Sequence, residues 1–173
     1  MKIKIRYVLA VIFAFIIGWV IYGNTYIEIS HYNIESERIP DSFNGFCIVQ
    51  ISDLHNAEFG TDNKKLISKI KDAKADIIAI TGDMIDWEKT DVDVAINFAK
   101  NIAEIAPTYY VNGNHEAGVP DEYDKLKNGL LDAGVIILEN SLVDIVKGEE
   151  KITIIGINDP SFMVNSAGDT NGD

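Results

Sequence analysis

The fold of this chain is decided by residues Ile48–His55, which read Ile-Val-Gln-Ile-Ser-Asp-Leu-His. An apolar run of strand length ends abruptly in a carboxylate, Asp53, and an imidazole, His55. In a doubly wound α/β sheet, ligands bind just beyond the carboxyl ends of the strands. Asp53 and His55 are therefore expected at that edge of a sheet, where both side chains can reach the same point.

The same pattern occurs twice more along the chain. The run Ile77–Thr81 leads into Gly82 and Asp83, and the run Thr108–Val111 leads into Asn112–Glu116. A single Asp or Asn after a strand is often only a helix cap. Three strand signals in a row that end in metal-binding or proton-transferring side chains, and that hold two of the three histidines, predict a metal site instead.

The residue types at these strand ends suit divalent metal ions. Asp53 and His55 offer a carboxylate oxygen and an imidazole nitrogen, Asp83 offers a carboxylate that can bridge two cations, and Asn114 offers a neutral carbonyl oxygen. Such mixed ligands favour Mn²⁺, Fe²⁺ or Zn²⁺ over a structural zinc site made of thiolates. Two such ions lower the pKa of a bridging water and hold a phosphoryl group.

His115 and Asp86 are the candidate catalytic residues. His115 follows the candidate ligand Asn114, a position that suits donation of a proton to a leaving oxygen. Asp86 lies three residues after Asp83, from where its carboxylate could orient the imidazole of His115. The hypothesis predicts that loss of His115 lowers turnover and leaves the metal content unchanged.

Apolar periodicity predicts helices between the strands. They are expected in three places: after a cap at Thr61 or Asp62, over Asp91–Ala106, and over Asp121–Ala133. A fourth strand is expected at Val135–Leu138. These spacings are those of successive βαβ units, and they predict a parallel sheet.

Two further segments contain strand patterns. Leu142–Val146 and Ile152–Ile157 predict a β-hairpin, and residues 158–173 read as a loop or tail. Partly alternating apolar residues over Tyr26–Ile39 also predict a strand, which is followed by turn residues.

The N-terminus predicts a membrane anchor. Lys2, Lys4 and Arg6 precede an apolar run over residues 7–22, which is close to the roughly 20 residues needed to span a bilayer. A cleaved signal peptide is the alternative, but no small-x-small cleavage site follows the run. Because the basic residues precede the span, the rest of the chain is expected outside the cytoplasm.

The charge of the chain excludes one class of partner. The formal net charge is -12, with 27 acidic residues against 15 basic ones. So acidic a surface repels the phosphate backbone, and no nucleic-acid binding is expected. The oligomeric state cannot be read from the sequence.

Three motifs, in their order and at their spacing, resemble those of the calcineurin-like metallophosphoesterases: Asp53-x-His55, Gly82-Asp83 and Gly113-Asn114-His115-Glu116. The basic N-terminal anchor and the segments Ile39–Phe46 and Gly156–Pro160 resemble the membrane-associated bacterial branch of that family. The resemblance implies hydrolysis of phosphodiester or pyrophosphate bonds with a dimetal-activated water. It also implies a phosphoester substrate that is small or lipid-linked, such as UDP-2,3-diacylglucosamine.

The resemblance also implies two divalent ions, with Mn²⁺ preferred and Fe or Zn as alternatives. It assigns the roles as follows: Asp53, His55 and Asp83 at one ion, Asp83 and Asn114 at the other, and His115 paired with Asp86 at the leaving group. The family pattern continues with another histidine and a Gly-His-x-His segment, whereas this chain has no histidine after His115. The chain is therefore expected to be truncated before the last metal ligands.

The implied fold is α/β, a two-sheet sandwich flanked by helices, with only its N-terminal half present and one transmembrane helix before it. The expected domains are an anchor over residues 1–24, a linker or edge strand over 25–45, and the N-terminal part of the phosphoesterase domain over 46–173. The expected location is the cell membrane, with a single span and the phosphoesterase domain outside the cytoplasm.

Two functions stay open at this point. One is a membrane-anchored, metal-dependent phosphoesterase, which explains the motif residues. The other is a catalytically inactive truncated fragment that binds metal or phosphate weakly. A purely structural membrane protein explains none of the motif residues.

Overall fold

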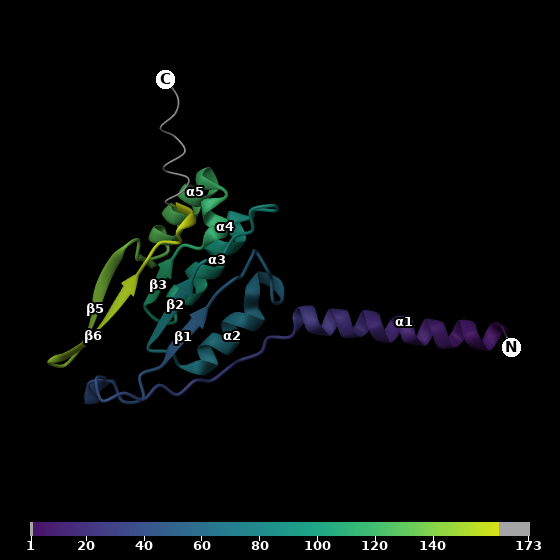
Figure 1. The fold of residues 1–173 in the computed structure, drawn as a ribbon, viewed down its shortest axis with the longest axis horizontal. Coiled ribbons are helices and arrows are strands. Elements are labelled where there is room, and N and C mark those ends of the chain that lie inside the picture. The colour runs from purple at the N-terminus through teal and green to yellow at the C-terminus, as the bar shows by residue number, and fades with distance from the viewer. Residues whose placement is uncertain (1, 163–173) are drawn as a thin grey trace, which may run out of the picture. The chain divides into compact units, whose positions relative to one another are not determined.

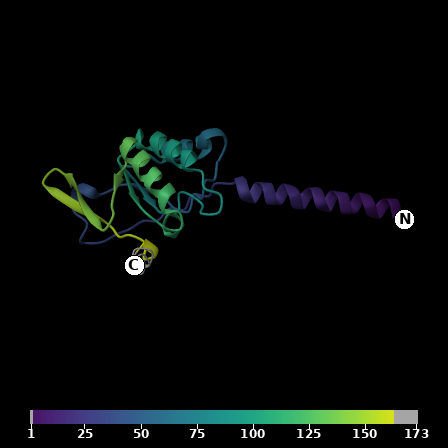
Figure 2. The same cartoon turned by 90° about the horizontal axis from the view of Figure 1, so that it is seen from above.

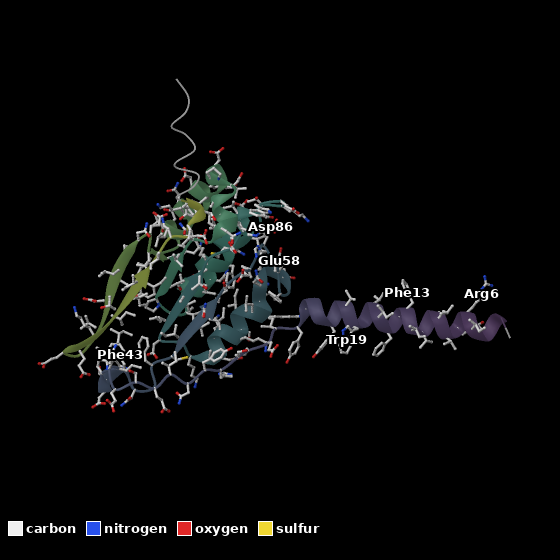
Figure 3. All side chains as sticks on the ribbon, viewed as in Figure 1. Arg6, Phe13, Trp19, Phe43, Glu58 and Asp86 are labelled. Carbon is white, nitrogen blue, oxygen red and sulfur yellow. The ribbon has the colours of Figure 1, made fainter. Side chains whose placement is uncertain are left out.

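The computed structural model describes residues 2–162, and the chain divides into two compact units, Met1–Asn33 and Ile34–Asp173. The first unit contains one long helix, α1 (Lys2–Thr25). Its apolar side chains are exposed, among them Phe13 and Trp19 (Figure 3). No helix in the described part of the chain is long and apolar enough to cross a membrane. The structure therefore does not show the predicted span.

The strand predicted over residues 26–39 does not form, and that prediction is wrong. A strand is stable only when its backbone groups pair with a neighbouring strand. The alternation of Ile27 and Ile29 does not supply such a partner. The turn predicted after this segment contains one short 3-10 helix, η1 (Asp41–Phe43).

The second unit is built on a parallel sheet of four strands in the order β1-β2-β3-β4 (Figure 1). The strands, all predicted, are β1 (Ile48–Ile51), β2 (Ile77–Thr81), β3 (Thr108–Val111) and β4 (Ile136–Ile137). Ile48 pairs with Ile77, and Ile78 pairs with Thr108. In this register β1, β2 and β3 end at the same edge of the sheet.

Three helices cover one face of this sheet: α2 (Lys64–Ala73), α3 (Val92–Ala103) and α5 (Pro120–Asp132) (Figure 2). Crossovers of one hand between strands in sequential order place all connecting helices on the same face. The parallel sheet with flanking helices agrees with the predicted α/β fold. The main core lies between the sheet and these helices, and Ile78, Phe98 and Leu126 are among its fully buried members.

The helix ends differ from the predictions in two details. Residues Thr61–Asn63 form a 3-10 turn, η2, and α2 begins at Lys64 without a side-chain cap, so neither Thr61 nor Asp62 caps it. Helix α3 is capped by the Asp91 side chain, which accepts a hydrogen bond from the Val94 N–H. It ends at Ala103, three residues before its predicted end.

The predicted hairpin forms from β5 (Ser141–Lys147) and β6 (Glu150–Gly156), which pair in antiparallel fashion. It is a second, two-stranded sheet on the face of the first sheet that the helices leave free. Apolar residues join the two sheets: Val143, Ile145 and Ile154 of the hairpin against Ile77, Tyr109 and Leu138. Most of the predicted tail, residues 163–173, lies outside the described residues.

Candidate metal centre

The predicted site lies where β1, β2 and β3 end, and backbone hydrogen bonds tie the first two turns together. The Asp53 N–H donates to the Gly82 carbonyl at 3.2 Å, and the His55 N–H donates to the Asp83 carbonyl at 3.0 Å. The Asn56 N–H donates to Met84 O at 3.0 Å. Because the turns after β1 and β2 form this ladder, their side chains are held next to each other.

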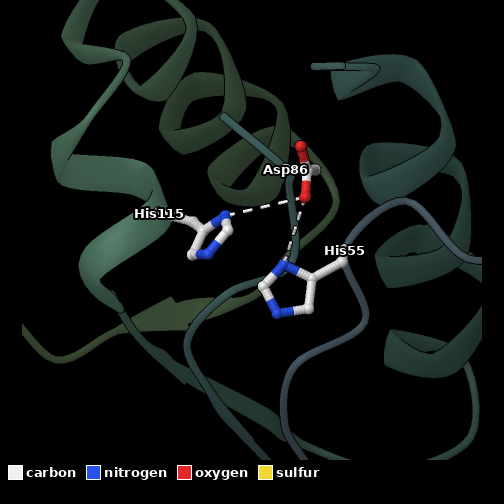
Figure 4. Close-up of side chains that lie close together, drawn as sticks. All are labelled: His55, Asp86 and His115. Carbon is white, nitrogen blue, oxygen red and sulfur yellow. Dashed lines mark ion pairs between the residues drawn. The ribbon is translucent and has the colours of Figure 1, made fainter. Parts of the chain in front are cut away.

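Two overlapping groups of possible ligands result. Asp53, His55 and Asp83 each offer one ligand atom, and these atoms lie within 4.8 Å of one another. The Nε2 of His55 is 3.7 Å from the Oδ1 of Asp53. His55, Asp86 and His115 form the second group (Figure 4). The structure thus brings together five of the six residues predicted from the sequence.

Several of these residues have left-handed backbone conformations. The φ angles are 55° at Asp53, 46° at His55 and 52° at Asp83. Non-glycine residues rarely adopt positive φ, although Asp, Asn and His do so most readily. Each such residue costs on the order of 1–3 kcal/mol and persists only where the surrounding structure holds it. In this protein the hydrogen-bonded ladder between the turns holds these residues.

Gly82 and Gly113 allow the turns after β2 and β3 to touch. A Cβ atom on Gly82, whose φ is +87°, would lie 2.6 Å from the Gly113 nitrogen. A Cβ atom on Gly113 would overlap the Asp83 carboxylate. In this contact the His115 N–H donates to the Asp83 Oδ1 at 2.9 Å. Any side chain at either glycine would separate Asp83 from the turn that carries His115.

His115 is fixed by contacts on two sides. The Trp87 N–H donates to its Nδ1 at 3.4 Å, and the Trp87 ring stacks on the imidazole with 4.4 Å between centroids. The His55 ring meets it edge to face at 4.2 Å. Sequence reasoning missed Trp87, since a single aromatic residue in a loop carries no signal of its own.

Asp86 lies between the two histidines. Its Oδ2 is 3.8 Å from the Nδ1 of both His55 and His115, which is longer than a hydrogen bond. The predicted pairing with His115 therefore takes the form of an ionic contact shared with His55. Backbone N–H groups of Lys89 and Glu88 donate to Oδ1 and lower the pKa of Asp86, and the two histidines lower it further.

The third turn contributes a short helix that the sequence did not predict, α4 (Asn114–Ala117). Asn114 begins it directly before His115 and is exposed. Glu116 is fully buried and accepts hydrogen bonds from both ligand-bearing turns. It was noted only as part of a motif, although its place at the third helical position is typical of a carboxylate that reaches back to the start of a helix.

These residues fit a divalent cation. Two carboxylates converge with an imidazole, their ligand atoms all within 4.8 Å of one another, and a cation between them would offset the repulsion of the two charges. The Nδ1 of His55 is buried without a hydrogen-bond partner among the described residues. Oxygen and nitrogen ligands of this kind suit Mn²⁺, Fe²⁺ and Zn²⁺ alike. The geometry therefore supports a metal centre without selecting the metal.

Residues 47–168 match the family model described as calcineurin-like phosphoesterase. The chain belongs to the calcineurin-like phosphoesterase family. The match covers the whole parallel sheet and the three turns of the metal centre. Members of this family are hydrolases that act on phosphoesters and depend on two metal ions.

Relatives within the calcineurin-like phosphoesterases support the same conclusion. The uncharacterized metallophosphoesterase YkoQ of Bacillus subtilis is 33% identical over 118 residues, which are 66% of this chain and 43% of YkoQ. The uncharacterized metallophosphoesterase YkuE of the same organism is 45% identical over 96 residues, 53% of this chain and 34% of YkuE.

A more distant relative is a transmembrane protein with a metallophosphoesterase domain from Danio rerio. It is 26% identical over 137 residues, 73% of this chain and 30% of the relative. The matched part of the chain thus spans less than half the length of each of these relatives.

Proposed function

We propose that this chain carries the first part of a dimetal phosphoesterase site and that the protein hydrolyses phosphoester bonds. The observation that carries the proposal is the convergence of Asp53, His55 and Asp83 beside His115 at one sheet edge. Membership of the calcineurin-like phosphoesterase family supports the same reaction.

Each residue has a proposed role in this reaction. Asp53, His55 and Asp83 hold one divalent ion, and Asp83 and Asn114 hold the other. Bound ions of this kind lower the pKa of a water and polarise a phosphoryl group. The ladder between the turns after β1 and β2 keeps the ligands in place before substrate arrives, which removes an entropic cost from the reaction.

His115 is proposed to donate a proton to the leaving oxygen. Its Nδ1 accepts the Trp87 N–H, so Nε2 is the atom that carries the proton in the neutral ring. Stacking on Trp87 fixes the plane of the ring. The Asp86 carboxylate lies 3.8 Å from the Nδ1 of both histidines and places negative charge beside them.

Hydrolysis of bis-(p-nitrophenyl) phosphate with added Mn²⁺ tests the proposal. We expect turnover that EDTA stops, and we expect His115→Ala to lower it by roughly 10²–10⁴-fold with metal content retained. Asp83→Asn is the matched variant in which metal is lost. A His115→Ala protein that has lost its metal would make His115 a ligand, contrary to the proposed role in proton donation.

A second candidate is a catalytically inactive metal binder. The observation that favours it is the convergence of Asp53, His55 and Asp83, which explains metal binding without requiring turnover. Mn²⁺ binding that depends on Asp83, without any turnover by this chain, would select this candidate. Absence of both binding and turnover would contradict both.

The metal, the substrate and the location extend the proposal. We propose Mn²⁺ as the metal and a lipid-linked phosphoester, such as UDP-2,3-diacylglucosamine, as one substrate class. We also propose a single N-terminal span with the phosphoesterase domain outside the cytoplasm. The basic residues before the apolar run over residues 7–22 support the span, and the Danio rerio relative is named a transmembrane protein.

Protease protection tests the location. Protease added to intact spheroplasts should digest the domain that follows the apolar run. Full protection of the domain, with digestion after lysis, would place it in the cytoplasm instead.

A further inference from the structure

Glu116 is the one charged residue among the described side chains that is fully buried, with 0% of its surface exposed. Glutamate is almost never buried to this extent unless it is paired. None of the Lys, Arg or His side chains that the structure describes forms an ion pair with it. The catalytic roles proposed above do not use Glu116 either, so its burial needs a separate explanation.

Backbone N–H groups bind the Glu116 carboxylate in place of a cationic side chain. Oε2 accepts the N–H of Asp83 at 2.9 Å and the N–H of Gly113 at 2.8 Å. Oε1 accepts the N–H of Met84 at 2.7 Å and that of Ile85 at 3.4 Å. These N–H donors satisfy both carboxylate oxygens in the absence of water.

The four amides belong to two different turns. Three come from Asp83 and the two residues after it, in the turn that follows β2, and the fourth is that of Gly113, in the turn that follows β3. Gly82 and Gly113 bring these turns into contact, and the His115 N–H reaches the Asp83 carboxylate across it. Glu116 therefore joins the turn that carries Asp83 to the turn that carries His115.

We propose that Glu116 is a positioning residue that presets the divalent-cation site by holding Asp83 in its left-handed conformation. Asp83 has a φ of 52°, and two hydrogen bonds from residues 83 and 84 to one carboxylate resist its relaxation. The inference rests on the proposed function, because the ligand it prepares for is the metal ion. Groups behind a metal ligand typically affect metal affinity by 10–100-fold.

Two substitutions at Glu116 separate the effect of its charge from the effect of its length. Glu116→Gln keeps the size but turns an amide group toward one pair of N–H donors, which it cannot accept. Glu116→Asp keeps the charge but is shorter by about one carbon–carbon bond, roughly 1.5 Å, so the carboxylate cannot reach both turns.

The control is Thr108→Val at the opposite end of β3. Thr108 is 1% exposed, and its hydroxyl donates to Ala106 O at 3.0 Å. This variant also removes a buried polar interaction and keeps the side-chain volume, but it leaves the turns at the carboxyl edge untouched. It therefore reports what a general loss of stability does to metal binding.

The experiment is a Mn²⁺ titration in which electron paramagnetic resonance measures the free ion, at a temperature where circular dichroism shows each variant folded. We expect Kd to rise by about 10–100-fold for Glu116→Gln and Glu116→Asp, and to stay unchanged for Thr108→Val. A wild-type Kd in both Glu116 variants, with lower melting temperatures only, would overturn the proposal.

Hydrogen exchange in the wild-type protein gives a readout that does not depend on folded variants. The amides of Asp83, Met84 and Gly113 should exchange slowly in metal-free protein, because Glu116 already binds them. Fast exchange that becomes slow only with Mn²⁺ would show that the ion orders the turns, and the proposal would be wrong.

Failure of the proposed function has a different signature. If Asp83→Asn leaves the affinity for Mn²⁺ unchanged, the metal centre is elsewhere. Both the proposed function and the proposed role of Glu116 are then wrong. If Asp83→Asn abolishes binding while Glu116→Gln binds as wild type does, only the role of Glu116 falls.

Discussion

The helix-covered core and the carboxyl edge of the sheet use the same three strands in opposite ways. In the core, β2 and β3 contribute Ile78, Ile80 and Tyr110, each at most 1% exposed, to an apolar layer packed on α3 and α5. Beyond the last residues of the strands, the backbone has positive φ at Asp53, His55 and Asp83.

The comparison separates the region that stabilises the fold, the core, from the region proposed to bind the metal, the carboxyl edge of the sheet. Core packing stabilises the fold through buried apolar area. The edge holds strained backbone and converging carboxylates, which destabilise the metal-free protein and prepare it for a cation. Substitutions in the core should therefore change stability without changing metal affinity, whereas substitutions at the edge should change metal affinity.

The largest effect is expected in the core. Phe98 of α3 is 1% exposed, and Phe98→Ala should lower the free energy of unfolding by about 3–5 kcal/mol through lost burial and a cavity. Urea denaturation measures the loss. A Mn²⁺ titration at low temperature should give the wild-type Kd, and a weaker Kd would mean that core and edge are coupled.

Gly82→Ala should lower both the stability of the fold and the affinity for Mn²⁺. A methyl group at a φ of +87° costs about 1–2 kcal/mol in backbone conformation, and its 2.6 Å approach to the Gly113 nitrogen adds about 1–3 kcal/mol. The control is Gly148→Ala in the hairpin, where φ is +68° and nothing lies within 4 Å. Gly148→Ala should lose stability only through the cost in backbone conformation and should keep its Mn²⁺ affinity. Equal losses in both variants would argue against the close contact.

Alkaline pH should weaken the core through Tyr110. Its side chain is 1% exposed, and burial, with a smaller effect of Glu116, raises its pKa well above 10. A raised pKa gives stability that is present below pH 10 and is lost above it, as the unfolded chain releases the proton. The loss should be about 1.4 kcal/mol per pH unit.

Tyr110→Phe checks the origin of this loss. The difference in unfolding free energy between the variant and the wild type should be constant below pH 10 and should then change in favour of the variant. Parallel curves up to pH 11 would mean that Tyr110 ionises as easily in the folded protein as in the unfolded one.

The smallest change in stability is expected at the edge. Asp53→Asn removes one of two converging carboxylates and keeps a residue that tolerates positive φ. Metal-free protein should gain a few tenths of a kcal/mol, the usual size for an exposed charge interaction, since the Asp53 side chain is 63% exposed. The increase in melting temperature caused by Mn²⁺ should disappear. A less stable metal-free variant would show that Asp53 is held by favourable contacts.

The strands and the ligands at their ends could be predicted because both leave a local signal. An apolar run followed at once by Asp53, Asp83 or His115 is visible in the sequence, and parallel pairing brings such ends to one edge. The hairpin and α3 also left local signals, the strand patterns of Leu142–Val146 and Ile152–Ile157 and the apolar periodicity over Asp91–Ala106.

What the sequence did not reveal depends on contacts between distant residues. The bond from Glu116 to Asp83 spans 33 residues, and the stacking of Trp87 on His115 joins two separate turns. Asp53, with its positive φ, is bonded to Gly82, which lies in a different turn. The strand predicted over residues 26–39 failed for the same reason, since a strand needs a partner that no local pattern specifies.

The sequential order of the strands has a consequence for synthesis on the ribosome. Strands β2, β3 and β4 each pair with the strand made just before them, roughly 30 residues earlier. The sheet can therefore grow in the order of translation. Asp53 and Asp83 emerge before Glu116. A nascent chain in which translation has reached only β3 would hold both carboxylates, but not the residue that binds the turn carrying Asp83.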